Sequence, residues 1–371
     1  MKKFVLLSLI VTFIYGCQSN NENKTLPLNN NGAAEVTTDK NFFNEEGKIV
    51  TPESYPTDET SRQILKTQSI VGVNNFLHKP ELTPTDNQPV VRMNRDTYYS
   101  FAVVDVSKGA EIMMPKIPDG KYMSVQGVTE DHRIQAMRYG SGTFNLSTHT
   151  GEHLYLIIRL DATFTESEAK DIQDLMKIEA NSNMEFAAFP VNKNSFYQVE
   201  NSLKSKLPAI VKADGINLMR GMFTDPRDES GKNFSNEKHQ VGAALGWGGA
   251  QMIDNIYESS GNFSTDKCYQ VTFEDPNNKA FWSITVYNEK GFMFNDLANY
   301  SSNTAIANND GTYTINFGCG EKAVNNIEIN NPSNQFNMVV RHYQPSNQVI
   351  KENYRIVPLI KEVPTKTKNK M

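Results

Sequence analysis

The hydrophobic period changes twice along this chain, and these changes constrain its fold more than any other feature. From Val90 to Leu160, apolar residues alternate with polar ones or form short runs between turns, which is typical of β-strands. Between residues 165 and 260 they recur at the intervals of a helix. From Cys268 to Tyr343 strand-like runs return. The sequence therefore predicts a mainly β chain with a helical middle.

The first strand-rich region contains a strand–turn–strand segment at Val90–Val106, VVRMNRDTYYSFAVVDV. Its β-branched and aromatic residues favour strands, whereas Asn94-Arg95-Asp96 favours a turn. Leu154–Leu160 is almost continuously apolar, which is typical of a central strand. Turn signals recur about every 8 to 12 residues, as they do in a β-sandwich. We therefore expect a sandwich over residues 41–160.

Helical signals dominate the middle of the chain. Thr165-x-x-Glu168 is a capping box, and the apolar residues after it fall at helical intervals. Two further helical patterns begin near Ser195 and Ser235, so we expect a helical segment over residues 161–262. One more helix is predicted earlier, around Ser61–Phe76.

The N-terminus has the pattern of a bacterial lipoprotein signal peptide over residues 1–17. A charged start, MKK, precedes an apolar run, Phe4–Ile14, that is shorter than the roughly 20 residues a membrane-spanning helix needs. Gly16 and Cys17 then resemble a lipobox, so we expect Cys17 to carry acyl chains that anchor the protein stably. Gln18 follows the cysteine and favours the outer membrane of the envelope. The alternative is an ordinary signal peptide that ends in cysteine.

The expected mature chain begins with a polar, asparagine-rich segment. Residues 18–40 have no hydrophobic periodicity and predict a disordered tether. The net charge is −5 and no basic stripe is present, so we expect no nucleic-acid partner. The expected partners are the membrane, through the acyl anchor, an unknown ligand or envelope protein, and a second copy of the chain in a homo-oligomer.

Several short segments resemble a known family. They are Arg92-x-Asn94-x-Asp96-Thr97-x-Tyr99-Ser100, the glycine-rich Gly246-x-Gly248-Gly249-Ala250, the strand Ala280–Tyr287, and Val339-Val340-Arg341-x-Tyr343-x-Pro345. Together they resemble bacterial envelope proteins that carry two paired domains of unknown function, numbered 1254 and 1214. The resemblance extends over residues 70–361 and keeps the same order of segments.

The resemblance implies an immunoglobulin-like β-sandwich, a short helical segment and a jelly-roll-like β-sandwich. Combined with the periodicity, it places the first domain at residues 41–160 and the second at residues 263–361. The family has no settled activity, so the resemblance implies a fold and leaves the function open.

Two groups of polar residues are candidates for a ligand site. Arg92, Asn94, Asp96 and Tyr98 are candidates to line a polar pocket; the alternative is that Asn94 and Asp96 hold a tight turn through side-chain-to-backbone hydrogen bonds. Arg341 lies within an apolar strand, so its charge needs a carboxylate or a ligand. A structural ion pair and a ligand contact are both consistent with that need.

Aromatic and cysteine residues of the second domain give two further predictions. Trp282, Tyr287 and Tyr300 are candidates for a sugar-stacking surface, with packing in a core or an interface as the alternative. Cys268 and Cys319 both lie at strand edges, and an oxidising compartment favours a disulfide between them. Two free thiols are the alternative.

The sequence contains one formal metal-site motif, His149-Thr150-Gly151-Glu152-His153, which matches H-x-x-E-H. Such a motif needs a helix to bring both histidines to one face, and Gly151 between two strand patterns favours a hairpin turn instead. A looser metal site at His149 or His153 is the alternative. The chain has no P-loop, G-x-S-x-G, H-E-x-x-H or C-x-x-C, so we expect no metal and no cofactor.

These features favour a lipid-anchored cell-envelope protein that acts as a binding or interaction module for a glycan, a lipid or a protein. The alternative is an envelope enzyme that acts on a small or polymeric substrate, with its polar groups in Arg92–Tyr98 or Tyr287–Tyr300. A structural role in an assembly is a third hypothesis.

Overall fold

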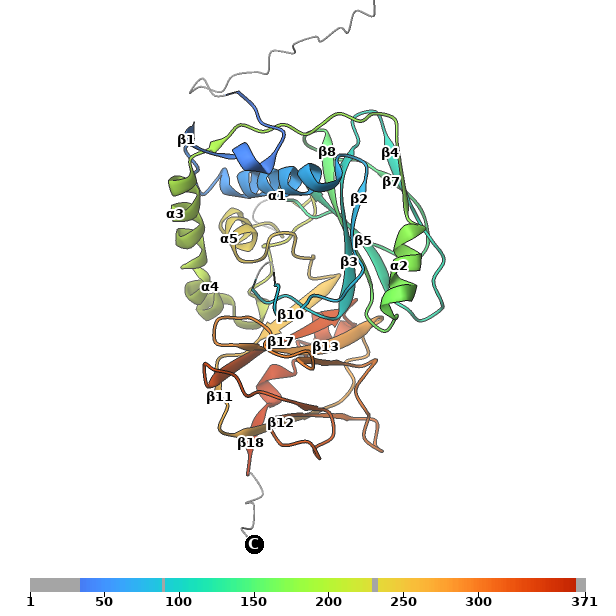
Figure 1. Cartoon of the computed structure of the whole chain (residues 1–371). Helices are drawn as coiled ribbons and strands as arrows, with labels where there is room; N and C mark the ends of the chain where they lie inside the picture. Colours follow the sequence, from blue (N-terminus) through green and yellow to red (C-terminus); the bar gives the residue numbers. More distant parts are fainter. Residues whose placement is uncertain (1–33, 89–90, 229–232, 365–371) are drawn as a thin grey trace, which may run out of the picture.

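The computed structural model describes residues 34–88, 91–228 and 233–364. An N-terminal domain, residues 34–249, consists of two sheets and a helical layer, and a C-terminal domain, residues 250–364, consists of two stacked sheets (Figure 1). Within the described ranges, no helix has both the length and the apolar character needed to cross a membrane. The prediction of a mainly β chain with helices in its middle is confirmed.

The central element of the N-terminal domain is a five-stranded antiparallel sheet in the order β2-β3-β8-β5-β6. Its middle strand, β8, is buried along its whole length, as its apolar sequence predicts. The strands are β2 (Phe76–Lys79), β3 (Thr97–Asp105), β5 (Met123–Thr129), β6 (Arg138–Tyr139) and β8 (His153–Asp161).

One face of this sheet packs on a second, three-stranded sheet in the order β7-β4-β9. Alternate residues of β3 and β8, among them Val104, Leu156 and Ile158, meet Ile112 and Met114 of β4 in the core between the sheets. Helix α2 (Glu166–Asp174) begins at the predicted capping box of Thr165 and Glu168. The outer strands are β4 (Ala110–Met114), β7 (Gly142–Leu146) and β9 (Lys177–Ala180).

The opposite face of the five-stranded sheet is covered by helices. Val103, Tyr155 and Ile157 pack against Ile64 of α1 and Phe196 of α3 in a second core. The helical layer contains α1 (Tyr55–Val71), α3 (Lys193–Lys204), α4 (Leu207–Asp214) and α5 (Asn236–Gly246). Short elements near it are η1 (Asp39–Asn41), β1 (Phe43–Lys48) and η2 (Gly215–Asn217).

The first helix differs from its expected position at Ser61–Phe76. It begins at Tyr55, because Pro56 is tolerated in the first turn, and it ends before Gly72, whose φ of 78° takes the chain out of the helix. Phe76 instead starts β2. The helix also packs in the helical layer and not between the sandwich sheets, although it lies in the range expected for the sandwich.

The expected tether and signal peptide fall mostly on residues 1–33, which lie outside the described residues. Of the tether, residues 34–40 are described, and they contact the body of the domain. Val36 forms a β-bridge with Ala188, and Asp39 accepts a hydrogen bond from Ser69 over 3.0 Å.

The C-terminal domain consists of two sheets in the orders β10-β17-β13-β14 and β16-β15-β12-β18, with β11 also paired to β17. Trp282, Ile284 and Val340 from the first sheet meet Ile315 and Phe317 from the second in a shared core. The first sheet contains β10 (Asn255–Ser259), β11 (Phe263–Ser264), β13 (Phe281–Asn288), β14 (Asn299–Ser301) and β17 (Gln335–Tyr343). The second contains β12 (Cys268–Phe273), β15 (Tyr313–Phe317), β16 (Asn326–Ile327) and β18 (Lys361–Val363), with α6 (Asn347–Ile350) and η3 (Val357–Leu359) nearby.

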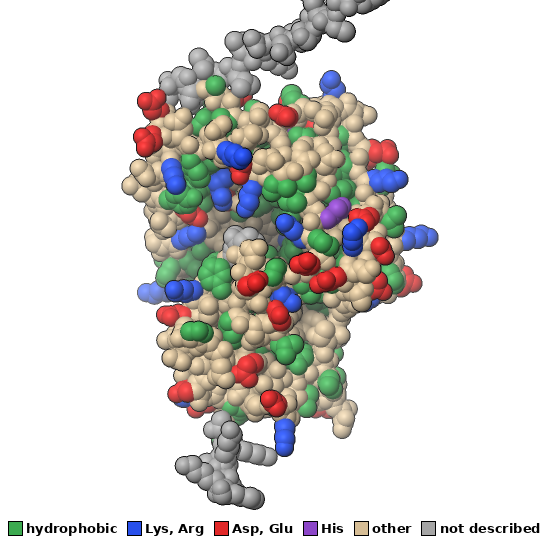
Figure 2. Space-filling view, in the orientation of Figure 1, with side chains coloured by type: hydrophobic (Ala, Val, Ile, Leu, Met, Phe, Trp, Pro, Cys, Tyr) green, Lys and Arg blue, Asp and Glu red, His purple; other side chains and the backbone are tan. Residues whose placement is uncertain are grey.

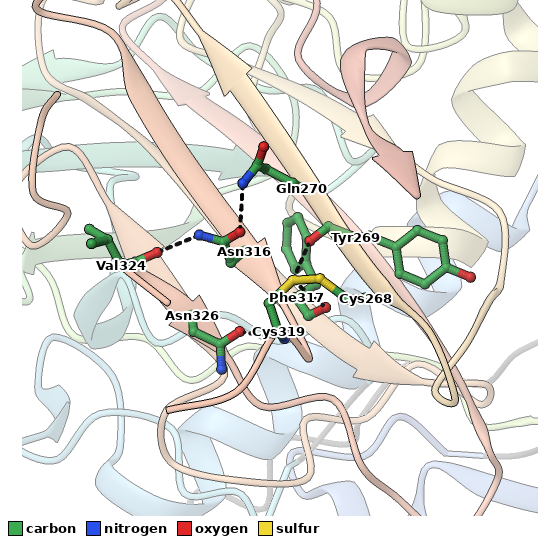
Figure 3. The surroundings of a disulfide bond; sticks show 8 residues. All are labelled: Cys268, Tyr269, Gln270, Asn316, Phe317, Cys319, Val324 and Asn326. Atoms are coloured by element: carbon green, nitrogen blue, oxygen red, sulfur yellow. Dashed lines mark hydrogen bonds between the residues drawn. A yellow bond between two sulfur atoms is a disulfide. The ribbon is translucent and has the colours of Figure 1, made fainter. Parts of the chain in front are cut away.

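A disulfide joins Cys268 and Cys319 in the second of these sheets (Figure 3). It links the first residue of β12 to the turn after β15, and the two Cα atoms are 4.8 Å apart. The backbone amide of Cys319 donates to Oδ1 of Asn326 over 2.8 Å, which holds the turn. The bond closes a loop with a sequence separation of 51.

The two domains meet at the five-stranded sheet. Helices cover the half of its face that contains Val103 and Tyr155, and the sheet with β10, β17 and β13 lies at the other end (Figure 1). There Tyr122 packs against Phe281 and Tyr343, with ring centroids 5.5 and 5.6 Å apart. We call the contact between these two sheets the junction.

Candidate functional site

A row of polar residues crosses the five-stranded sheet where the helical layer gives way to the C-terminal domain. Tyr99 of β3 pairs with Arg159 of β8, Arg159 pairs with Ser124 of β5, and Ser124 pairs with Tyr139 of β6. Residues in register on neighbouring strands share one face, so these four side chains lie side by side. The next row toward the helices is more apolar and contains Phe101 and Ile157.

A second polar row comes from the C-terminal domain. Tyr257 of β10, Arg341 of β17 and Ser283 of β13 are in register with one another. The loop before β3 lies against this row and brings Asp96 to it, 2.6 Å from the Ser283 hydroxyl. The junction therefore contains two buried arginines, Arg159 and Arg341, on interior strands of two different sheets.

Asp96 and Arg341 form the more completely bonded part of the junction. The Asp96 side chain is fully buried and accepts hydrogen bonds from Ser283, Tyr343 (3.1 Å) and Asn299 (3.0 Å). Nη1 of Arg341 lies 3.9 Å from Oδ2 of Asp96. A buried carboxylate with three donors and a nearby guanidinium is well compensated.

Arg341 is also held by neutral acceptors. Its Nη2 donates to the backbone oxygen of Arg92 over 2.7 Å and to the hydroxyl of Tyr287 over 2.9 Å, while Nη1 donates to Thr285 over 3.2 Å. Burial lowers the pKa of Arg341, but Tyr287 and Asp96 outweigh it, so the pKa lies above its ordinary value. Arg341 is therefore a charged structural residue that ties β17 to the loop before β3.

Arg159 is buried to a similar degree but has far fewer partners. Only 6% of the residue is exposed, and its Nη1 donates to Oε1 of Gln126 over 2.8 Å. Gln126 is oriented by its own bond to the backbone oxygen of Gly248, at 2.7 Å. Among the described residues, no carboxylate lies within 4.0 Å of Arg159, and its Nε and Nη2 make no hydrogen bond.

The groups around Arg159 are mainly tyrosines. The guanidinium carbon lies 5.7 Å from the centre of the Tyr99 ring, and the charge also interacts with Tyr257, Tyr122 and Tyr343. At neutral pH a phenol is uncharged, because its ordinary pKa is about 10. The tyrosines therefore supply dipoles and ring faces to Arg159 without supplying a counter-charge.

A carboxyl and a phenol lie at the far end of the row. The Tyr139 hydroxyl donates to Oδ1 of Asp254 over 2.7 Å. Burial raises the pKa of Asp254, although Tyr139 and the charge of Arg159 oppose that shift. Burial also raises the pKa of Tyr139. This pair can hold a proton near Arg159, which is a property of acid–base groups in enzymes.

The side of the junction next to the helices is lined by half-buried aromatic rings. Tyr99 and Phe101 stack with centroids 5.6 Å apart and planes 6° apart. Trp247 and Tyr257 are also half-buried. On the face drawn in Figure 2, the surface is hollowed between the helical layer and the C-terminal domain. Partly exposed rings beside a buried cation are typical of a small-molecule site.

Five of the residues predicted from the sequence lie together in the junction: Arg92, Asn94, Asp96, Tyr287 and Arg341. The turn interpretation also holds, because Oδ1 of Asn94 accepts the backbone amide of Asp96 over 3.2 Å. Nδ2 of Asn94 donates to the Tyr99 hydroxyl over 2.9 Å and so links the turn to the Arg159 row.

The other three predicted residues lie elsewhere. Tyr98 points into the core between the N-terminal sheets and donates to the backbone oxygen of Phe164 over 2.9 Å. Trp282 is fully buried between Phe273 and Tyr313, and Tyr300 packs at the edge of the same core. The predicted sugar-stacking surface is wrong, because Trp282 and Tyr287 expose no ring face.

The histidine motif forms no metal site in the described part of the chain, where no cluster of three or more ligating residues occurs. His149 contacts Asp131 over 2.9 Å, and His153 is buried against the backbone oxygen of Met184 at 2.7 Å. Gly151 between them has a φ of 66°, as a turn requires. Cys17 lies outside the described residues.

Two shallow grooves, of about 470 and 720 Å³, lie side by side along β9. Their amide side chains are already used: Asn74 donates to the backbone of Ser182 over 2.8 Å and Asn181 to that of Lys108 over 3.1 Å. Neither groove contains a buried cation or a stack of aromatic rings, so the junction is the better candidate.

Arg159 is the functional candidate that the sequence analysis missed. It lies in the run His153–Asp161, which is otherwise mostly apolar. A charge inside an apolar strand needs a partner, and the same argument that singled out Arg341 applies to it. A local sequence pattern does not show that this partner is missing, because the junction is assembled from distant segments of the chain.

Family models match two regions of the chain. Residues 73–185 match the family described as protein of unknown function DUF1254, and residues 250–347 match the family described as protein of unknown function DUF1214. No curated protein matches the chain.

Two solved structures are similar in fold. The VPA0106 protein from Vibrio parahaemolyticus has 17% sequence identity and a TM-score of 0.62, covering 84% of this chain and 98% of its own. An uncharacterized protein from Burkholderia cenocepacia has 12% identity and a TM-score of 0.50, covering 84% and 87%. At these identities the likeness extends to the fold alone. The chain belongs to the proteins in which a DUF1254 domain is followed by a DUF1214 domain.

Proposed function

We propose that this protein is a lipid-anchored protein of the bacterial cell envelope whose body binds a small ligand at the junction of its two domains. The ligand has an anionic group that pairs with Arg159. The anchor is supported by the signal-peptide pattern of residues 1–17 and by Cys17 at its end. The polar segment after Cys17 would connect the membrane anchor to the folded body that binds the ligand.

The single observation that supports ligand binding is Arg159, a buried guanidinium with one hydrogen bond, to Gln126, and no carboxylate within 4.0 Å among the described residues. Removing a charge from water costs several kcal/mol even after the surrounding protein relaxes. A sequence that keeps such a charge without a partner loses stability, and a ligand with the opposite charge restores the balance. The half-buried rings of Tyr99 and Phe101 give that ligand an entrance and a contact surface.

A second function, an envelope enzyme, is favoured by one observation. The Asp254 carboxyl has a raised pKa and accepts a hydrogen bond from the Tyr139 hydroxyl. Tyr139 lies two strands away from Arg159 in the same row. An anion held at Arg159 would lie near this proton-carrying pair. If the bound ligand is converted, Asp254 is the residue we expect to exchange a proton with it.

The binding proposal is tested by thermal unfolding of the full chain with acetate, benzoate, inorganic phosphate, phenyl phosphate and glucose. A ligand specific to the folded state adds about 2.7 kcal/mol of stability at a hundredfold excess over its Kd. We expect one or more of the anions, but not glucose, to raise the midpoint, and Arg159→Gln to remove the shift. An equal shift in Arg159→Gln would contradict the site.

The anchor is tested separately by labelling growing cells with palmitate. The unaltered protein should take up the label and fractionate with the membrane, whereas Cys17→Ser should do neither. Labelled Cys17→Ser, or an unlabelled protein in the soluble fraction in both cases, would contradict the anchor. Assay of the binding hit for conversion, with and without Asp254→Asn, separates an enzyme from a binding protein.

A further inference from the structure

We infer that the ligand is a monocarboxylate on a flat aromatic body, with its carboxylate on the Nε–Nη2 edge of Arg159 and its ring against Tyr99 and Phe101. This inference rests on the proposed function and names the chemical class of ligand that the same site would take. Three features of the junction lead to it: the free edge of the guanidinium, the local charge and the neighbouring rings.

The free edge of Arg159 has the geometry of a carboxylate receptor. Nη1 is already bonded to Gln126, and among the described residues Nε and Nη2 have no hydrogen-bond partner. These two nitrogens direct parallel N–H groups outward from one edge of the guanidinium, within its plane. A carboxylate accepts such a pair in a bidentate arrangement, which is the strong form of this contact. Gln126 fixes the plane in advance, because Gly248 holds its amide.

The charges around Arg159 favour a ligand with one negative charge over a ligand with two. Arg159 is the cation of its row, and Asp254 already interacts electrostatically with it. Arg341 already pairs with Asp96 and donates hydrogen bonds to three neutral acceptors. A phosphate monoester carries close to two negative charges at pH 7 because its second pKa is about 6. A single guanidinium matches a carboxylate more closely.

Tyrosine hydroxyls add uncharged donors around the same point. The Tyr99 hydroxyl accepts from Asn94, and the Tyr257 hydroxyl accepts from Asn255 over 3.3 Å. In the described part of the chain, neither hydroxyl has an acceptor for its own proton. Both tyrosines are close enough to influence the charge of Arg159. Two uncommitted donors beside a guanidinium suit an oxyanion and need no further charge.

The neighbouring rings specify the body of the ligand. Tyr99 and Phe101 are stacked and half-buried on the face that contains Arg159, and Tyr99 is its direct neighbour across the strands. Trp247 lies beyond them, and its Nε1 is already bonded to Thr60, so it offers only its ring. Such a surface favours a flat apolar group, because stacked aromatic rings attract one another beyond the effect of the area they bury.

The test uses four probes with the full chain: benzoate, acetate, benzamide and phenyl phosphate. Benzamide keeps the ring and removes the charge, acetate keeps the charge and removes the ring, and phenyl phosphate doubles the charge. Equilibrium binding by calorimetry should rank benzoate first, with each other probe weaker by at least about tenfold. Neutral benzamide should be the weakest of the aromatic probes.

Four variants locate the binding. Arg159→Lys keeps the charge but loses the planar fork, so benzoate should bind at least about tenfold more weakly. Phe101→Leu should weaken benzoate about threefold or more and leave acetate unchanged. Tyr99→Phe removes one donor and should weaken benzoate about threefold. Arg138→Gln is the matched control, because Arg138 is half-buried on the same sheet but faces the other way, and it should bind benzoate normally.

Each outcome decides between the proposals. If phenyl phosphate binds more tightly than benzoate and Arg159→Lys weakens it, the monocarboxylate class is wrong while the proposed site stands. If acetate binds as tightly as benzoate, the aromatic body is wrong. If no probe binds the unaltered chain, or if Arg138→Gln weakens benzoate as much as Arg159→Lys does, both this inference and the proposed function are overturned.

Discussion

Arg341 and Arg159 are both buried at the junction, yet only Arg341 has a carboxylate within 4.0 Å among the described residues. Each lies on an interior strand of its sheet, and each is more than nine-tenths buried. Arg341 has Asp96 at 3.9 Å and three hydrogen bonds to the groups around it. Arg159 has one hydrogen bond, to Gln126, and no ion-pair partner in the described part of the chain.

The difference separates a structural residue from a binding residue. Asp96 and Arg341 come from segments 245 positions apart, so their contact holds the two domains in one arrangement. Arg159 makes no such link, because Gln126 is its neighbour on the same sheet. A buried arginine that holds nothing together is available for a ligand.

The largest change in stability is expected when Arg341 is replaced. Arg341→Met leaves Asp96 buried without its cation, and breaking a buried pair in this way costs about 3 to 5 kcal/mol of unfolding free energy. Urea unfolding followed by circular dichroism measures this loss. The control is Arg227→Met, whose side chain is 83% exposed, so its loss should leave stability nearly unchanged. An Arg341→Met variant as stable as the control would contradict the structural assignment.

A smaller loss is expected at the disulfide, which lies in the C-terminal sheet that does not form the junction. Replacing Cys268 and Cys319 by serine removes a cross-link over a separation of 51 residues and should cost about 2 to 4 kcal/mol. Unfolding in urea with and without a reductant measures it. Benzoate affinity should stay the same, since Arg159 is on the other domain. Loss of benzoate binding in this folded variant would show that the junction depends on the C-terminal core.

Replacing Arg159 should raise the unfolding free energy, whereas replacing Arg341 should lower it. Arg159→Met removes a buried charge that has no ion-pair partner within 4.0 Å among the described residues and replaces it with an apolar side chain, so stability should rise by about 1 to 2 kcal/mol. The same unfolding experiment without ligand measures it. A loss as large as that of Arg341→Met would mean that Arg159 is a structural residue, and the comparison would fail.

The smallest expected effect is the loss of folding stability as the pH falls. Burial, followed by the nearby His239, lowers the pKa of His132, whose Nε2 accepts the amide of Gly248 over 3.0 Å. Below pH 6.5 the unfolded chain binds a proton that folded His132 does not, so stability is lost as pH falls. By pH 5.5 this loss is about 1 kcal/mol.

His132→Asn should remove this part of the acid sensitivity. Asparagine tolerates the φ of 63° at this position. Unfolding free energies of the two proteins at pH 7.5, 6.5 and 5.5 provide the measurement, with pH values chosen about the ordinary histidine pKa of 6.5. His239, Arg133 and the other buried groups are common to both proteins, so their contributions cancel in the difference. Parallel pH curves would contradict the assignment to His132.

The sequence was sufficient for the layered β–helix–β layout, because hydrophobic period and capping are local properties. The capping box at Thr165 and the buried strand at Leu154–Leu160 are where the patterns predict them. The helix predicted at Ser61–Phe76 begins six residues earlier, at Tyr55, because proline in a first turn and glycine after a last turn mark its ends better than periodicity does.

The site was only partly predictable. Asp96 and Arg341 attract attention as charges in strand-like surroundings, and they do lie together. Trp282 and Tyr287 were misjudged as a surface, because aromatic residues of a strand have the same pattern whether their face is covered or open. Arg159 was missed because its significance depends on missing partners, which only the assembled junction reveals.

The most direct test of the comparison is the unfolding midpoint of the full chain and of Arg159→Met, each measured with and without saturating benzoate. We predict that Arg159→Met without benzoate unfolds at or above the midpoint of the unaltered chain. We also predict that benzoate raises the midpoint of the unaltered chain and leaves that of Arg159→Met unchanged. A variant that unfolds well below the unaltered chain, with no benzoate shift in either protein, would contradict the account and make Arg159 a second structural arginine.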